Sequence, residues 1–186
     1  MKEGAKGESE WLREVDWRRT RAYALGLTGM FLNLQGREAQ GIVAPGAEAQ
    51  ELKAEIISKL KGLRDEGAGE VAINEVFDTA RIYRGPYLGN APDLIIGYNS
   101  GYRASWDGAT GVVAAPVFED NRKPWSGDHC IDPRLVPGVL FCTHPIEAKD
   151  PALIDIAPTA LSLFGLDPPK HMDGKPLFKA GPLQTD

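Results

Sequence analysis

Few residues of this sequence can carry acid–base or metal chemistry at neutral pH, because it contains only three histidines, at positions 129, 144 and 171. His129 has the most informative context, the segment Trp-Ser-Gly-Asp-His-Cys at 125–130. The glycine before Asp128 and His129 lets the backbone turn sharply and aim a carboxylate and an imidazole into one space. Both groups are good ligands for zinc and similar divalent ions. Because the motif is so short, the alternative to a metal ligand stays open: His129 could lie at the surface, or be buried in the core with its hydrogen bonds satisfied.

A group of aromatic and basic residues precedes this segment and could contact a substrate. It comprises Tyr98, Tyr102, Arg103, Trp106 and Trp125. The guanidinium of Arg103 presents paired donors that suit phosphate oxygens, and Trp125 could stack against a nucleoside. The alternative is that these aromatic side chains pack onto the loop that carries them.

The common signatures of nucleotide-binding folds and of several hydrolase classes are missing. The 186 residues contain no G-x-G-x-x-G, no P-loop, no H-E-x-x-H and no G-x-S-x-G. A dinucleotide-binding fold and a hydrolase with a nucleophile elbow are therefore not indicated.

Short strands interleaved with helices are expected to position these residues. Apolar residues at spacings of three and four predict an amphipathic helix over 48–64, and a second helix is expected from an Asp155 cap to Phe164, ended by Gly165. Strands are expected within 21–34, 70–77, 93–98, 112–118 and 138–142. This alternation indicates an α/β fold with a partly parallel sheet.

Composition narrows the classes of protein and of partner. The formal net charge is −5, with 21 basic and 26 acidic residues spread along the chain, which argues against a nucleic-acid partner. No apolar run approaches the ~18 residues of a membrane span. The length fits one domain over 1–186, with 1–14 as a loose tail. No export signal is apparent, and the compartment stays open.

Several segments occur together in an order that is typical of one enzyme superfamily. They are His129 in its glycine bend, the strand-like 138–142, Asp-Ile-Ala-Pro-Thr at 155–159, Phe-Gly at 164–165, Pro-Pro at 168–169 and Met-Asp-Gly-Lys at 172–175. An earlier turn, Asn-Leu-Gln-Gly-Arg-Glu at 33–38, fits the same pattern, with Arg37 and Glu38 expected to pair at the surface. From about residue 16 to 177, the chain resembles the C-terminal part of the alkaline phosphatase superfamily. The branch that it resembles is that of the type I phosphodiesterases and nucleotide pyrophosphatases.

The resemblance implies a phosphoric ester hydrolase built as an α/β/α sandwich with a mixed, largely parallel sheet, of which 1–186 would be the C-terminal half. Members of this family use a Thr or Ser nucleophile and hold two zinc-like ions with Asp and His ligands. His129 matches the last histidine ligand. Asp128 matches no ligand of the family, so it is at best a second metal ligand and is expected instead to orient the loop.

The nucleophile and the other ligand motifs of the family have no counterpart in these 186 residues. A catalytic zinc ordinarily takes about three protein ligands, so one imidazole cannot hold two ions. We therefore expect a truncated or split form that is inactive alone and does not bind the two ions stably. Its partners would be a complementing N-terminal half or a second copy, and its substrate in the intact protein a phosphate ester or nucleotide. A non-catalytic interaction module, and a part of a related sulfatase or phosphomutase, are the alternatives.

Overall fold

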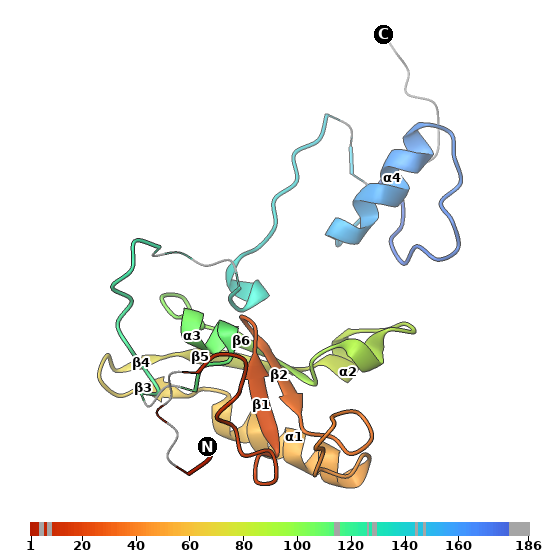
Figure 1. Ribbon diagram of the computed structural model, residues 1–186. Helices are drawn as coiled ribbons and strands as arrows, with labels where there is room; N and C mark the ends of the chain where they lie inside the picture. The colour runs from red at the N-terminus through yellow and green to blue at the C-terminus, as the bar shows by residue number, and fades with distance from the viewer. Residues whose placement is uncertain are drawn as a thin grey trace. The chain divides into compact units, whose positions relative to one another are not determined.

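The computed structural model describes residues 1–3, 6, 9–113, 116–125, 127, 130–143, 145–146 and 148–178 (Figure 1). The chain divides into two compact units, Met1–Pro137 and Gly138–Asp186.

The first unit is built on a four-stranded sheet with the strand order β1-β2-β6-β5 (Figure 1). Its strands are β1 (Ala22–Leu25), β2 (Gly29–Leu32), β5 (Ile73–Asp78) and β6 (Leu94–Tyr98). All three strand pairings are antiparallel. Two short strands, β3 (Arg64–Asp65) and β4 (Glu70–Val71), pair antiparallel with each other. The expected strand segments 21–34, 70–77 and 93–98 are thus confirmed. The first contains two strands, β1 and β2, and the second contains β4 and most of β5.

The mixture of helices and strands is confirmed, but the expected parallel pairing is wrong for the described strands. The turn between β1 and β2 spans only residues 26–28, and so short a connection permits only an antiparallel hairpin. Strands β2 and β5 do run in the same direction, and helix α1 (Ala47–Leu60) connects them as a crossover would. They are not neighbours, because β6 lies between them and pairs antiparallel with both.

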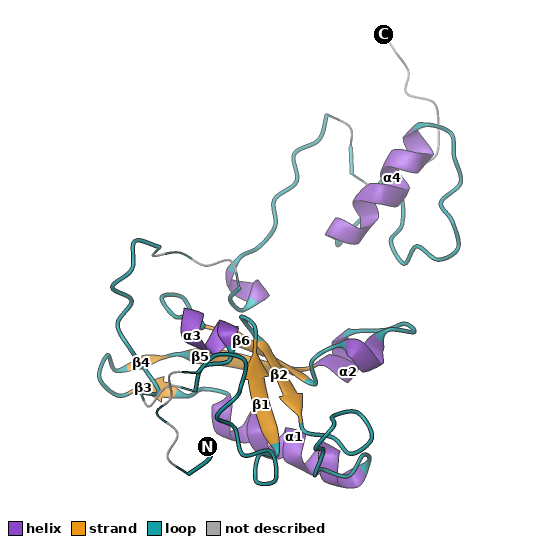
Figure 2. Ribbon diagram, viewed as in Figure 1, coloured by secondary structure: helices purple, strands orange, loops and turns teal. Residues whose placement is uncertain are grey.

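Helix α1 packs on one face of this sheet and confirms the helix predicted over 48–64 (Figure 2). It ends earlier than predicted, at Leu60, because Gly62 turns the chain with a φ of 76° and donates its N–H to Ile73. The buried core forms two clusters: Leu32, Val43, Ala49 and Leu52, and Ile73, Val76, Leu94 and Ile96. Ile56 of α1 packs against both clusters, so this helix joins the two halves of the sheet.

The strands predicted over 112–118 and 138–142 do not form in the described part of either segment. Val112 instead donates its N–H to Asp107 and closes the short helix α3 (Trp106–Thr110). In 138–142, Val139 and Phe141 are 83% and 92% exposed. Apolar, β-branched composition favours a strand, but a strand also needs a neighbour for its backbone hydrogen bonds.

The other helical segments of the first unit are short. They are α2 (Thr79–Ile82), α3, and 3₁₀ turns at Leu88–Asn90 and Pro133–Leu135. Within the described ranges, no helix is both long and apolar enough to cross a membrane.

The second unit is centred on helix α4 (Ile156–Leu163), preceded by a 3₁₀ turn at Leu153–Asp155. The predicted helix and its terminating Gly165, with a φ of 70°, are confirmed. Asp155 occupies the N-cap position of this helix, as predicted, but its side chain makes no capping hydrogen bond to it. Its carboxylate accepts the N–H of Ala152 at 2.9 Å and that of Lys175 at 2.8 Å, because the following chain folds back over the start of the helix.

Candidate functional site

The predicted site residues lie in the long segment that leaves the sheet at the end of β6 and returns to it at Asp132. At the exit, Asn99 donates its backbone N–H to Ala72 and its side-chain amide to the Val71 carbonyl at 2.8 Å. Helix α3 begins soon after, where the Ser105 hydroxyl accepts the Gly108 N–H at 2.9 Å. The segment therefore starts from a fixed point on the sheet and carries a capped turn of helix.

Arg103 lies against the part of this segment that precedes the predicted metal ligands. Its guanidinium stacks over the ring of Trp106 at 5.0 Å, and its Nη1 lies 3.5 Å from the carbonyl oxygen of Gly127. Gly127 comes directly before Asp128 and His129 in the sequence. Arg103 and Gly127, which are 24 residues apart in the sequence, are thus brought together.

The aromatic residues of the group divide between exposed and packed positions. Tyr102 packs edge to face on Phe118 at 6.3 Å and donates its hydroxyl to Asp65 at 3.2 Å, as the packing alternative predicted. Trp125 is 72% exposed, and its carbonyl accepts a hydrogen bond from the Asn121 side chain within a tight turn. An indole this exposed leaves most of its surface open to a ligand.

Asp132 anchors the end of the segment, three residues after His129. It is fully buried, and its N–H donates to the Tyr98 carbonyl at 2.9 Å, so it extends the contacts of β6. Its carboxylate accepts from the Asn74 amide at 2.7 Å and from the guanidinium of Arg134 at 2.5 to 3.2 Å. Gly97 leaves room for it, since a Cβ there would lie 3.3 Å from the Asp132 Cβ.

This anchor was not predicted from the sequence, because Asn74 and Asp132 are 58 residues apart. A local signal did exist in Asp-Pro-Arg at 132–134: an aspartate before proline is a typical helix cap, and here it caps the 3₁₀ turn by accepting the Arg134 N–H at 3.0 Å.

The Asp132 anchor predicts a specific pH dependence. Hydrogen bonds from the Arg134 side chain and backbone and from Asn74 lower the pKa of Asp132 from 3.8 to about 2. Since this pKa is lower in the folded state, the ionised carboxylate stabilises the protein fully above about pH 4, and this contribution is lost as the pH falls towards 2.

Asp132→Asn should therefore lower the free energy of unfolding at pH 6, and the curves of the variant and of the natural protein should converge near pH 2. Urea unfolding followed by circular dichroism between pH 6 and 2 measures both curves. A constant difference between them across this range would contradict the assignment.

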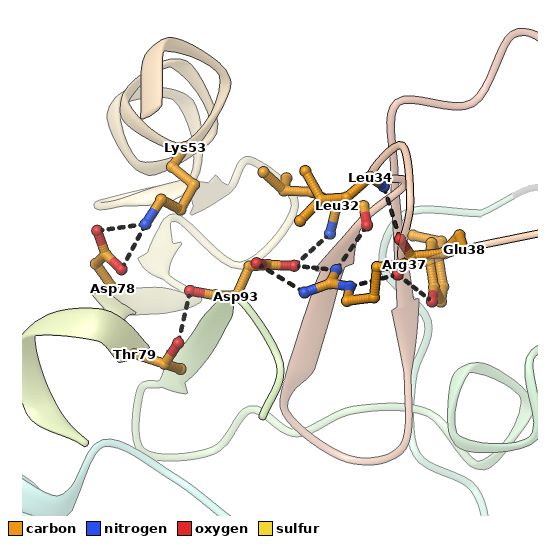
Figure 3. A network of polar contacts seen from close by, with 9 residues as sticks. Leu32, Leu34, Arg37, Glu38, Lys53, Asp78, Thr79 and Asp93 are labelled. Atoms are coloured by element: carbon orange, nitrogen blue, oxygen red, sulfur yellow. Dashed lines mark hydrogen bonds and ion pairs between the residues drawn. The ribbon is translucent and has the colours of Figure 1, made fainter. Parts of the chain in front are cut away.

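A second polar cluster fastens the turn after β2 to the start of β6 (Figure 3). Arg37 pairs with Asp93 at 2.6 Å and with Glu38 at 2.8 Å, and it donates to the Leu32 carbonyl at 2.8 Å. The hydrogen bond with Asp93 is the largest cause that raises the pKa of Arg37 above its ordinary value. The predicted Arg37–Glu38 pair is confirmed, but Asp93 was not foreseen as its third member. Because Arg37 pairs with both carboxylates and also donates to a backbone carbonyl, the cluster holds the turn in place.

The metal site predicted at Asp128 and His129 lies outside the described residues, as does His144. Among the residues that are described, no three or more His, Cys, Asp or Glu side chains form a group that could hold a metal ion. The described residues thus supply no ligand set, and the zinc site stays a prediction from the sequence.

Comparison with known proteins gave no matching family model, no matching curated protein and no matching solved structure. The resemblance to the alkaline phosphatase superfamily therefore remains a prediction that depends on its motifs.

Proposed function

We propose that this chain is the C-terminal portion of a metal-dependent phosphoric ester hydrolase of the alkaline phosphatase superfamily, in its phosphodiesterase and nucleotide pyrophosphatase branch. It would form one half of an α/β/α sandwich and supply one metal ligand, His129. The nucleophile and the remaining ligands would come from another part of the enzyme. The observation that carries this proposal is the order of the motifs from His129 to Lys175.

Contacts within the second unit support the significance of these motifs. The Asp155 carboxylate accepts the Lys175 N–H, and the Thr159 hydroxyl accepts the Leu177 N–H at 3.0 Å. Gly174 lies so close to the Ile154 carbonyl that a Cβ would overlap it. The segments that carry Asp-Ile-Ala-Pro-Thr and Met-Asp-Gly-Lys, which are separate in the sequence, therefore contact each other in the fold.

The surroundings of Arg103 support a substrate-side role in the first unit. Its guanidinium lies beside Gly127, which directly precedes the predicted ligands Asp128 and His129 in the sequence. A phosphate held by ions at such a site would need hydrogen-bond donors. When bound, the two ions would supply charge stabilisation to the attacking and leaving oxygens. Arg103 would add hydrogen bonds to phosphate oxygens, and the exposed Trp125 would offer a surface for a nucleoside base.

Hydrolysis of a chromogenic phosphodiester with added zinc tests this proposal. We expect no turnover by the chain alone. Co-expression with the N-terminal portion of a type I phosphodiesterase, which carries the nucleophile and the other ligands, should give zinc-dependent turnover. His129→Ala should abolish this turnover, whereas the matched change His171→Ala should leave it intact.

Zinc-dependent turnover by the chain alone would overturn the missing-ligand argument. Complemented turnover that survives His129→Ala would overturn the assignment of the ligand. A sulfate monoester in parallel reactions identifies a sulfatase if it is hydrolysed in place of the phosphodiester.

A further inference from the structure

An apolar cavity of about 390 Å³ lies beside β1, the outermost strand of the sheet. Three parts of the first unit line it: the N-terminal segment through Leu12 and Val15, β1 through Ala22 and Ala24, and the end of α3 and its following residues through Gly111 and Val113. Figure 1 shows the N-terminal segment, in red, running beside β1. The described residues that line it have no charged side chain, and Met1 among them carries the N-terminal amino group.

The wall formed by β1 exposes backbone hydrogen-bonding groups to the cavity. The Arg21 carbonyl accepts the Asn33 N–H at 2.8 Å, so these two residues form a hydrogen-bonded pair across β1 and β2. Such pairs alternate along an antiparallel ladder, and the next one is Tyr23 with Phe31. Ala22 and Ala24 fall between these pairs, so their N–H and C=O groups point away from β2, towards the edge that lines the cavity.

The opposite wall is held in place by a strained turn. Trp11 and Leu12 adopt left-handed φ values of 60° and 55°, which cost roughly 1–2 kcal/mol per residue outside glycine. Their N–H groups donate to Thr110 at 2.8 Å and Gly111 at 3.0 Å. Such strain persists only where the surroundings determine it, so these hydrogen bonds to the end of α3 fix the position of Leu12 in the wall.

The chemistry of these walls selects one class of ligand. Apolar walls favour an apolar occupant, but covering the N–H and C=O groups of Ala22 and Ala24 costs free energy unless the occupant pairs with them. A hydrocarbon-like molecule cannot do so, whereas the backbone of an extended peptide presents matching groups at the strand repeat. We propose that the β1 edge binds an extended, uncharged peptide segment with small apolar side chains, which adds a fifth strand to the sheet.

Binding of a neutral acetyl-Ala-Val-Ala-Val-amide peptide with a fluorescent label, followed by anisotropy, tests this site on the full chain. We expect saturable binding. The variant Ala24→Pro removes only an N–H that faces away from β2, and proline is tolerated at such edge positions, so it should weaken binding at least about tenfold. The matched variant Ala24→Ser keeps the N–H and should bind as the natural chain does.

Hydrogen exchange keeps the test valid even if Ala24→Pro perturbs folding. In the unmodified chain, the Ala24 amide should exchange fast without peptide and slowly with it. An N-methylated peptide that binds equally well would overturn the proposal, because the cavity would then be a site for apolar groups alone. Self-association without peptide that is lost in Ala24→Pro would also overturn it, because a second copy would be the occupant. None of these outcomes depends on the proposed hydrolase function.

Discussion

Gly41→Ala is expected to destabilise the first unit by at least about 3 kcal/mol, among the largest effects of any single substitution in this chain. A Cβ on Gly41 would overlap the carbonyl oxygen of Leu34, a backbone atom that cannot rotate away. The same turn carries hydrogen bonds from Ile42 and Val43 to the Asn33 carbonyl. Moving the backbone to accept the methyl group would break these bonds and detach the turn from β2. Urea unfolding followed by circular dichroism measures the loss.

Gly36→Ala is the matched control within the same turn. Gly36 has a φ of 83°, but nothing lies within 4 Å of a Cβ built there, so only the backbone conformation is strained. Its cost should be about 1 kcal/mol. If Gly41→Ala costs no more than Gly36→Ala, the close approach of the backbone is not what requires glycine at position 41.

Asp78→Ala is expected to cost about 3–5 kcal/mol, because it leaves a buried ammonium group without a partner. The Nζ of Lys53 lies 2.8 and 2.9 Å from the two carboxylate oxygens of Asp78, and the side chains are only 8% and 9% exposed (Figure 3). This ion pair joins α1 to the end of β5. The same urea experiment measures the cost, which should change little with added salt because water is largely excluded from the pair.

Two variants separate the buried charge from other effects of this change. Arg81 also approaches Asp78, at 4.0 Å, but it is 86% exposed, so Arg81→Ala should change stability by less than about 0.5 kcal/mol. In the double variant Lys53→Met/Asp78→Ala, the unpaired charge is gone, and most of the lost stability should return. A double variant as unstable as Asp78→Ala would show that the loss comes from the helix cap that Asp78 provides to Ala80.

The close approach of Gly41 to Leu34 and the Lys53–Asp78 ion pair matter for the candidate site, because they stabilise the strands to which its segment is attached. The Lys53–Asp78 pair fixes α1 to β5, and β5 supplies Asn74 to the Asp132 carboxylate. The turn that contains Gly41 holds Arg37, which pairs with Asp93 at the start of β6. Loosening either contact should therefore also loosen the ends of the segment that carries Arg103 and Trp125.

Local patterns in the sequence were sufficient for most of the elements. The spacing of apolar residues predicted α1, and the Asp155 cap with the terminating Gly165 predicted α4. Runs of β-forming residues between turn residues predicted β1, β2 and β6. The direction of strand pairing could not be predicted in this way, because it depends on β6 entering between β2 and β5, a choice made between distant segments. The run at 138–142 illustrates the same limit, since its composition indicates a strand while its neighbours decide whether one forms.

The amino-acid sequence by itself determined which residues could act: one glycine-flanked Asp-His pair, one arginine among aromatics and the motifs of the second unit. Only the tertiary structure decided that Arg103 meets Gly127, that Asp132 is buried between Asn74 and Arg134, and that Lys53 is buried in an ion pair with Asp78. The physical reason is that local structure follows from neighbours along the chain. Burial and charge pairing, in contrast, depend on groups that folding brings together from dozens of residues apart.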